Sequence, residues 1–240
     1  MCVIFFAYKI YPEFPLILLA NRDEFYNRPT EAAKNWRDFP QILAGRDLVG
    51  NGTWLGINNA GKFAAVTNYR DPNAPKGNVS RGNLVADFLK SDESAENYLK
   101  EIQKKASEFS GFNLIVGEIN AQKNELFYYS NRADKIKNLP RGIYGLSNHL
   151  LDTAWRKVEK GKQFLTENIN KNLSKDSFFE LLSDESLADD TDLPDTGIGK
   201  SREKLLSAIF IKTPIYGTRC STVLTFDNDF KFDFEERVFI

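Results

Sequence analysis

Short apolar segments separated by turns make up the first 70 residues of the chain. Residues 3–8 and 16–20 are continuous apolar runs of strand length, with prolines in the loop between them. Residues 53–58 and 63–68 flank a turn that contains Gly61, and a glycine there favours the backbone geometry of a hairpin. We therefore predict four strands in this part of the chain.

Helical periodicity begins after residue 80. Ser80 and Ser94 are suitable N-caps for two successive helices, because apolar residues follow each serine at intervals of three and four. Further helices are predicted around residues 154–165 and 178–182. Strands are predicted at residues 112–119, 125–129 and 143–146, and the chain closes with a predicted hairpin of residues 215–226 and 230–239.

The order of these elements is strands, helices, strands, helices, strands, without regular alternation. This order predicts an α+β fold whose sheets are mainly antiparallel. The sequence contains no internal repeat and no linker long enough to separate domains, so residues 1–240 are interpreted as a single domain. Residues 184–195 carry six acidic side chains and no basic one, which is typical of a solvated loop.

Charge and composition narrow the classes of function. The chain has 32 Lys and Arg against 33 Asp and Glu, a net charge of −1, so no nucleic-acid partner is expected. Lys9 interrupts the N-terminal apolar run, which is too short for a membrane span, and we expect a cytoplasmic protein with free thiols at Cys2 and Cys220. His149 is the only histidine, so any histidine base would have to be that residue, and no metal site is predicted.

Cys2 is the most informative single position. Met1 precedes a small side chain, and its removal would make Cys2 the N-terminal residue with its own α-amino group as a base. That amine titrates near ~7.7–8.0 and can accept a proton from a thiol of pKa ~8.5. The alternative is an inert, buried cysteine at the start of an edge strand. Position alone leaves both interpretations open.

Four polar residues directly follow the second predicted strand, namely Asn21, Arg22, Asp23 and Glu24. A run of polar groups at a strand end is either a salt-bridged exit or a functional site. In a site, the arginine would hold a thiolate or an oxyanion and a carboxylate would orient it.

Asn68, Asn148 and Arg219 also follow apolar segments, each at the end of a predicted strand. Amide and guanidinium donors at converging strand ends suit an oxyanion hole. For each asparagine taken singly, turn chemistry is the alternative. Arg81 lies at a predicted helix start, where free backbone amides could hold a phosphate, and Trp54 is a candidate for the core or a pocket wall.

Several longer motifs make the chain similar to a known family. Residues 1–6 (MCVIFF), 20–29 (ANRDEFYNRP) and 52–57 (GTWLGI) resemble the NRDE proteins, the transport and Golgi organisation family. The segments Thr67-Asn68-Tyr69, residues 111–115 (GFNLI), 144–148 (YGLSN) and 216–219 (YGTR) extend the resemblance over nearly the whole chain.

The resemblance implies a fold and a set of site residues. The family looks like a branch of the N-terminal-nucleophile hydrolases, with a four-layer αββα sandwich, and is similar to penicillin V acylases and bile salt hydrolases. Carried over, Cys2 is the nucleophile and Arg22 contacts its thiol. Asn68 and Asn148 become the oxyanion donors and Arg219 the second arginine. Those enzymes place an aspartate three residues after the first arginine, where this chain has Phe25. Asp23 follows Arg22 directly, and strand alternation predicts that it faces the other way.

Two functions follow from the resemblance and remain open at this point. One is a cysteine-dependent amidohydrolase acting on a small N-acyl or acyl-thioester metabolite, which requires no cofactor and has an acidic Cys2 thiol beside Arg22 and Arg219. The other is a non-catalytic carrier of haem, acyl-coenzyme A or lipid that uses the same cleft. Residues that would then contact the ligand, in either case, are Asn21, Glu24, Trp54, Tyr69, Arg81 and His149. The oligomeric state is not predicted.

Overall fold

The computed structural model describes residues 2–169, 171 and 174–240. Met1, whose removal the sequence suggests, lies outside the described residues. The chain forms two compact units. The first contains residues 1–27, 70–73 and 141–240, and the second contains residues 28–69 and 74–140. Each unit has its own antiparallel sheet and its own helices, so the predicted α+β class with antiparallel sheets is confirmed.

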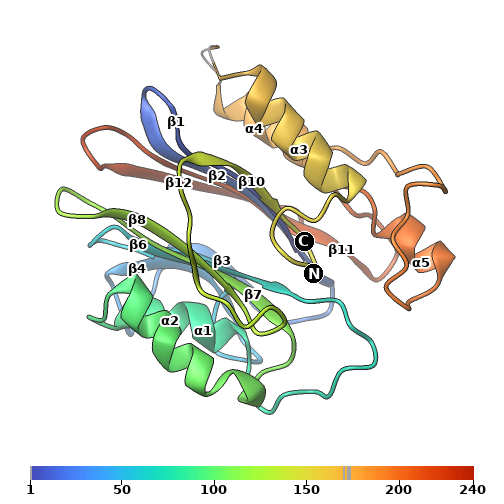
Figure 1. Cartoon of the computed structure of the whole chain (residues 1–240), viewed down its shortest axis with the longest axis horizontal. Coiled ribbons are helices and arrows are strands. Elements are labelled where there is room, and N and C mark those ends of the chain that lie inside the picture. The colour runs from blue at the N-terminus through green and yellow to red at the C-terminus, as the bar shows by residue number, and fades with distance from the viewer. Residues whose placement is uncertain (1, 170, 172–173) are drawn as a thin grey trace. The chain divides into compact units, whose positions relative to one another are not determined.

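The first unit is built on a five-stranded sheet in the order β10-β1-β2-β11-β12. Apolar residues of one face, such as Phe5 and Leu19, pack against Leu165 and Phe179 of the helices. Helices α3 and α4 accordingly lie along that face (Figure 1). The strands are β1 (Cys2–Tyr11), β2 (Phe14–Phe25), β10 (Gly142–Leu146), β11 (Tyr216–Phe226) and β12 (Phe232–Val238), and the helices are α3 (Arg156–Glu167), α4 (Lys175–Leu182) and α5 (Lys200–Leu205).

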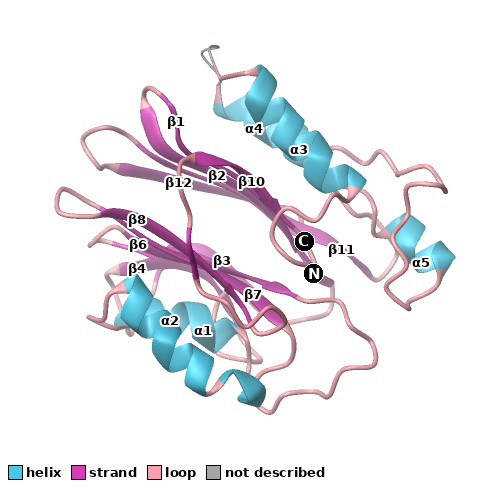
Figure 2. Ribbon diagram, viewed as in Figure 1, coloured by secondary structure: helices cyan, strands magenta, loops and turns pink. Residues whose placement is uncertain are grey.

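The second unit is built on a seven-stranded sheet in the order β3-β4-β5-β6-β7-β8-β9. Helices α1 and α2 cover one of its faces (Figure 2), and Val85, Phe88 and Leu99 pack there among the strand residues. The strands are β3 (Thr30–Asn35), β4 (Ile42–Asp47), β5 (Leu55–Asn58), β6 (Lys62–Asn68), β7 (Phe112–Ile119), β8 (Asn124–Ser130) and β9 (Lys137–Asn138). The helices are α1 (Gly82–Lys90) and α2 (Ala95–Lys104), followed by a 3-10 turn (Ala106–Glu108).

Local signals in the sequence are mostly confirmed at the element ends. Gly61 adopts a φ of 76° in the predicted β5–β6 turn, a value that favours glycine. Ser94 caps α2 by accepting a hydrogen bond from the backbone N–H of Asn97 at 3.3 Å. The prediction that Ser80 caps α1 is wrong, because α1 begins at Gly82 and its N-cap residue is Arg81, without a side-chain capping bond.

The helices in the described part of the chain are short or polar. None of these helices combines the length and the hydropathy that a membrane span requires.

Candidate active site

Strand pairing places Arg22 and both cysteines of the chain in one row across the five-stranded sheet. Arg22 of β2 lies directly opposite Cys2 of β1 and directly opposite Cys220 of β11. Residues that are paired in this way project from the same face of a sheet, with neighbouring Cβ atoms about 4.5–5.5 Å apart. Cys2 and Cys220 are therefore two strands apart, with the Arg22 side chain between them.

The Cys2 thiol is partly buried, and its burial is the dominant influence on its ionisation. Burial raises the pKa of Cys2, and the negative charge of Asp23 raises it further. Arg22 and a hydrogen bond from the Asp23 backbone N–H lower that pKa, but they do not outweigh burial. Burial thus counteracts the acidity that Arg22 gives the thiol, and a reaction at Cys2 needs a group that accepts the thiol proton.

Asp23 lies on the opposite face of β2, as strand alternation predicts. Its side chain is 1% exposed, and its Oδ1 accepts a hydrogen bond of 2.7 Å from Thr218 Oγ1. Burial raises the pKa of Asp23, whereas Lys157 is the largest influence that lowers it. In a strand, residues one and three positions after Arg22 lie on the same face, opposite the arginine. Asp23 therefore supplies a carboxylate on that face, although the residue three positions after Arg22 is Phe25.

The end of β10 is connected to Cys2 through Ser147. Ser147 Oγ donates to the backbone carbonyl of Cys2 at 3.3 Å and to Asn148 Oδ1 at 3.4 Å. Asn148 is fully buried, and its backbone carbonyl accepts a hydrogen bond of 2.7 Å from the N–H of Arg70. These bonds hold Asn148 beside the first residue of β1.

Arg219 lies at an irregularity in the pairing of β2 with β11. Thr218 pairs with Asp23 and Cys220 pairs with Arg22, so Arg219 is the extra residue of a β-bulge. Its guanidinium is largely buried and donates to the carbonyls of Phe25 and Ile240, each at 3.2 Å. Cys2, Arg22, Asn148 and Arg219 are thus brought to one end of the five-stranded sheet.

Four other candidates belong to the second unit, and they gather at one end of the seven-stranded sheet. Asn68 is the last residue of β6, and the Trp54 carbonyl accepts from Val66 of the same strand at 2.9 Å. The carbonyl of Gly111 accepts from the Tyr69 N–H at 2.9 Å and from Arg81 Nη1 at 3.1 Å. The contribution of Asn68, Trp54, Tyr69 and Arg81 to a site with Cys2 stays a prediction.

The remaining predicted ligand contacts of the first unit differ in their surroundings. Asn21 is 1% exposed, and its amide donates to the carbonyls of Leu182 and Ile209 at 2.8 and 2.9 Å while its Oδ1 accepts from Ser221 at 2.6 Å. Because both polar atoms bind inside the protein, we assign Asn21 a structural role. Glu24 Oε1 accepts from the Phe25 N–H at 2.9 Å, and His149 Nδ1 lies 2.8 Å from Thr153 Oγ1.

Sequence reasoning missed a group of buried charges on the helical side of the same sheet. Arg70 and Glu203 form an ion pair of 2.5 Å, with side chains 6% and 2% exposed. Lys157 of α3 is 3% exposed. The signal for Lys157 was available, because Lys157, Gly161 and Leu165 follow at four-residue spacing and form the buried stripe of α3. A lysine in such a stripe requires a buried partner.

Comparison with known proteins decides the family. The sequence profile of the family described as Transport and Golgi organisation 2 matches residues 1–240. The chain belongs to this family. The Transport and Golgi organization protein 2 homolog of Bos taurus is 40% identical over 255 residues, which cover 99% of this chain and 92% of that protein.

Two solved structures have a fold similar to that of this chain. The conjugated bile acid hydrolase from Clostridium perfringens, as a mutant, has a TM-score of 0.55 at 10% identity and covers 100% of this chain and 97% of its own. The ortholog of N-acylethanolamine-hydrolyzing acid amidase from Caenorhabditis elegans has a TM-score of 0.53 at 14% identity, with 93% and 92% covered. The fold is therefore similar to that of N-terminal-nucleophile hydrolases.

Proposed function

We propose that this protein is a cysteine-dependent amidohydrolase that acts on a small N-acyl metabolite, with Cys2 as the N-terminal nucleophile. The observation that carries the proposal is the strand register, which pairs Cys2 with Arg22 and places Asn148 and Arg219 at the same sheet end. The similarity of fold to a conjugated bile acid hydrolase and to an N-acylethanolamine-hydrolyzing acid amidase supports a hydrolytic reaction at the same kind of site.

The chemistry begins with removal of Met1, which frees the α-amino group of Cys2. This amine takes the proton of the Cys2 thiol, and the sulfur attacks the carbonyl carbon of the amide. The resulting oxyanion is stabilised by the side-chain amide of Asn148. When the C–N bond breaks, the leaving amine takes the proton from the α-ammonium group. A water molecule, deprotonated by the same amine, then hydrolyses the thioester and releases the acid.

The proposal also covers the arrangement of the sheets and a role for Asn68 of the second unit. The two sheets would stack between helical layers as an αββα sandwich, and Asn68 would supply the second oxyanion donor.

Hydrolysis assays with an N-acylethanolamine and a conjugated bile acid test the proposal. The wild-type chain, with loss of Met1 confirmed by mass, should release the free amine. Cys2→Ala keeps a small residue after Met1 and should lower the rate about a thousandfold or more. Cys220→Ala is the matched control and should retain activity. Turnover that survives in Cys2→Ala would end the proposal. Binding of these probes or of haem without any turnover, at equal strength in wild type and Cys2→Ala, would favour the carrier.

A further inference from the structure

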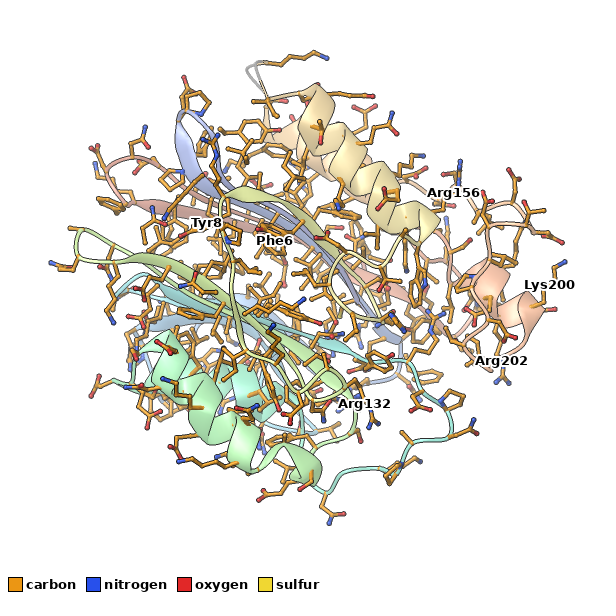
Figure 3. All side chains as sticks on the ribbon, in the orientation of Figure 1. Phe6, Tyr8, Arg132, Arg156, Lys200 and Arg202 are labelled. Carbon is orange, nitrogen blue, oxygen red and sulfur yellow. The ribbon has the colours of Figure 1, made fainter. Side chains whose placement is uncertain are left out.

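Lys157 is a buried cation that the proposed reaction does not use. It is the second residue of α3, and its ammonium group donates to the carbonyl of Leu206 at 2.9 Å and to that of Ala208 at 3.5 Å. The preceding residue, Arg156, is exposed (Figure 3). The two successive basic residues therefore differ in burial, and Lys157 is the buried one.

The segment that accepts hydrogen bonds from Lys157 also borders Asp23. After Ala208, the carbonyl of Ile209 accepts from Asn21, and the N–H of Ile211 donates to Thr218 Oγ1 at 2.9 Å. The Thr218 hydroxyl in turn donates to Asp23. Residues 206–211 thus run from the ammonium group of Lys157 to Asn21 and Thr218, the two strand residues beside Asp23, and the positive charge of Lys157 lowers the pKa of Asp23.

Groups of both charge signs surround the Lys157 ammonium group. Asp23 of β2, Cys2 of β1, Arg70 of the 70–73 segment and Glu203 of α5 interact with it electrostatically. Two cations and two carboxylates are therefore buried together behind the sheet. Lys157, Arg70 and Glu203 line a cavity of about 10 Å³, which is room for about one water molecule. Charges this far from bulk water interact strongly, since little solvent screens them.

We propose that Lys157 is a positioning residue for the Cys2 site, where its ammonium group faces the carboxylate of Asp23 and sets the electrostatic potential at the Cys2 thiol. The inference deepens the proposed function and rests on it for its biological meaning. Its test does not need turnover, because it measures the ionisation of the thiol directly.

The proposal has a definite sign. A positive charge at Lys157 favours the Cys2 thiolate, and Arg22 acts in the same direction, while Asp23 opposes both. Burial lowers the pKa of Lys157 to about 8. As the pH rises through that value, the ammonium group loses its charge and the thiol becomes harder to ionise. The ionisation of Cys2 should therefore extend over a wider pH range than that of an isolated thiol.

The experiment is the rate of iodoacetamide alkylation of Cys2 from pH 6 to 10.5, measured by peptide mass in the full-length protein. Lys157→Met removes the charge and should slow alkylation at pH 7.5 by about tenfold, as a shift of about one pKa unit requires. Lys157→Arg retains the charge at every pH and should give a steeper profile with faster alkylation than wild type at pH 9. Lys160→Met is the matched control, because Lys160 of the same helix is partly exposed and pairs with Asp184, and it should leave the profile unchanged.

The α-amino group of Cys2 titrates in the same range, but it is common to all variants and cancels in the comparison. Superimposable profiles of folded wild type and Lys157→Met would overturn the inference. If Lys157→Met does not fold, the Lys157→Arg profile decides, and equality with wild type at pH 9 would overturn it. Shifted profiles together with absent amide hydrolysis would leave the electrostatic role standing and refute the proposed reaction instead.

Discussion

The buried ion pair between Arg70 and Glu203 provides a stringent test of the electrostatics behind the site. Glu203 Oε2 accepts from Arg70 Nη1, and its Oε1 accepts from the N–H and the hydroxyl of Thr196 at 2.9 and 2.6 Å. The Arg70 guanidinium also lies 4.9 Å from the ring centroid of Trp155. Glu203→Gln keeps the volume and one oxygen for Thr196, but it leaves a buried cation without its counter-ion.

The expected loss follows from burial. Removing one partner of a buried ion pair costs about 3–5 kcal/mol, because the remaining charge keeps its desolvation penalty. Since a domain is stable by about 5–15 kcal/mol, Glu203→Gln should lower the urea midpoint substantially. The double variant Arg70→Met/Glu203→Gln should lose much less than the sum of the two single variants.

The assay is equilibrium urea denaturation, followed by circular dichroism. Asp190→Asn is the matched control, because Asp190 pairs with Lys200 and Lys204 on the surface and its loss should leave the midpoint unchanged. Hydrogen exchange adds a local readout. The Arg70 N–H, which donates to Asn148, should exchange faster in Glu203→Gln. Additive single and double variants, or a loss below about 1 kcal/mol in Glu203→Gln, would refute the reasoning.

Three further predictions concern single side chains. In the folded state the pKa of Lys157 falls to about 8, so between pH 8 and 10.5 the unfolded chain binds a proton that the folded chain does not. The free energy of unfolding of wild type relative to Lys157→Met should therefore rise by up to about 3 kcal/mol from pH 7 to 10.5 in urea titrations, and this gain is lost again as the pH falls through 8. Parallel curves for the two proteins would contradict this. Asn21→Ala removes three buried hydrogen bonds and should cost about 2–4 kcal/mol by the same method, whereas an unchanged midpoint would restore the ligand-contact interpretation. Burial and a hydrogen bond to Glu236 raise the pKa of Cys220. Iodoacetamide should therefore modify Cys2 first in the folded protein and both thiols equally in urea. Faster modification of Cys220 in the folded protein would show that its thiol is accessible and contradict the prediction.

The sequence predicts most strands that are continuous apolar runs. It misses strands that form only through pairing with a neighbouring strand. Of the six strands that the structure describes in the first 70 residues, β3 and β4 are absent from the four that the sequence predicts. β3 lies at the edge of its sheet, and its only apolar residues are two alanines. β9 has only two residues. The Ser80 prediction fails because α1 begins at Gly82, one residue later than a Ser80 cap requires.

The strand register brings several of the predicted site residues together, but the electrostatics around them could not be predicted from the sequence. Motif resemblance identified Cys2 and Arg22, and the register confirms that they are neighbours. The sequence could not show that burial outweighs Arg22 in setting the pKa of Cys2, because that balance depends on elements far apart in the chain. Lys157 is close to Asp23 only after α3 docks on the sheet, across a sequence separation that no local pattern spans.

Covalent trapping at Cys2 tests the central claim most directly. The protein, with Met1 removed, is mixed with p-nitrophenyl octanoate, quenched in acid within seconds, and digested for peptide mass analysis. An N-terminal nucleophile predicts an octanoyl group on the peptide that begins with Cys2, absent from Cys2→Ala and present in Cys220→Ala. An unmodified Cys2 peptide, or an octanoyl group found only on other residues, would contradict the assignment of Cys2 as the nucleophile.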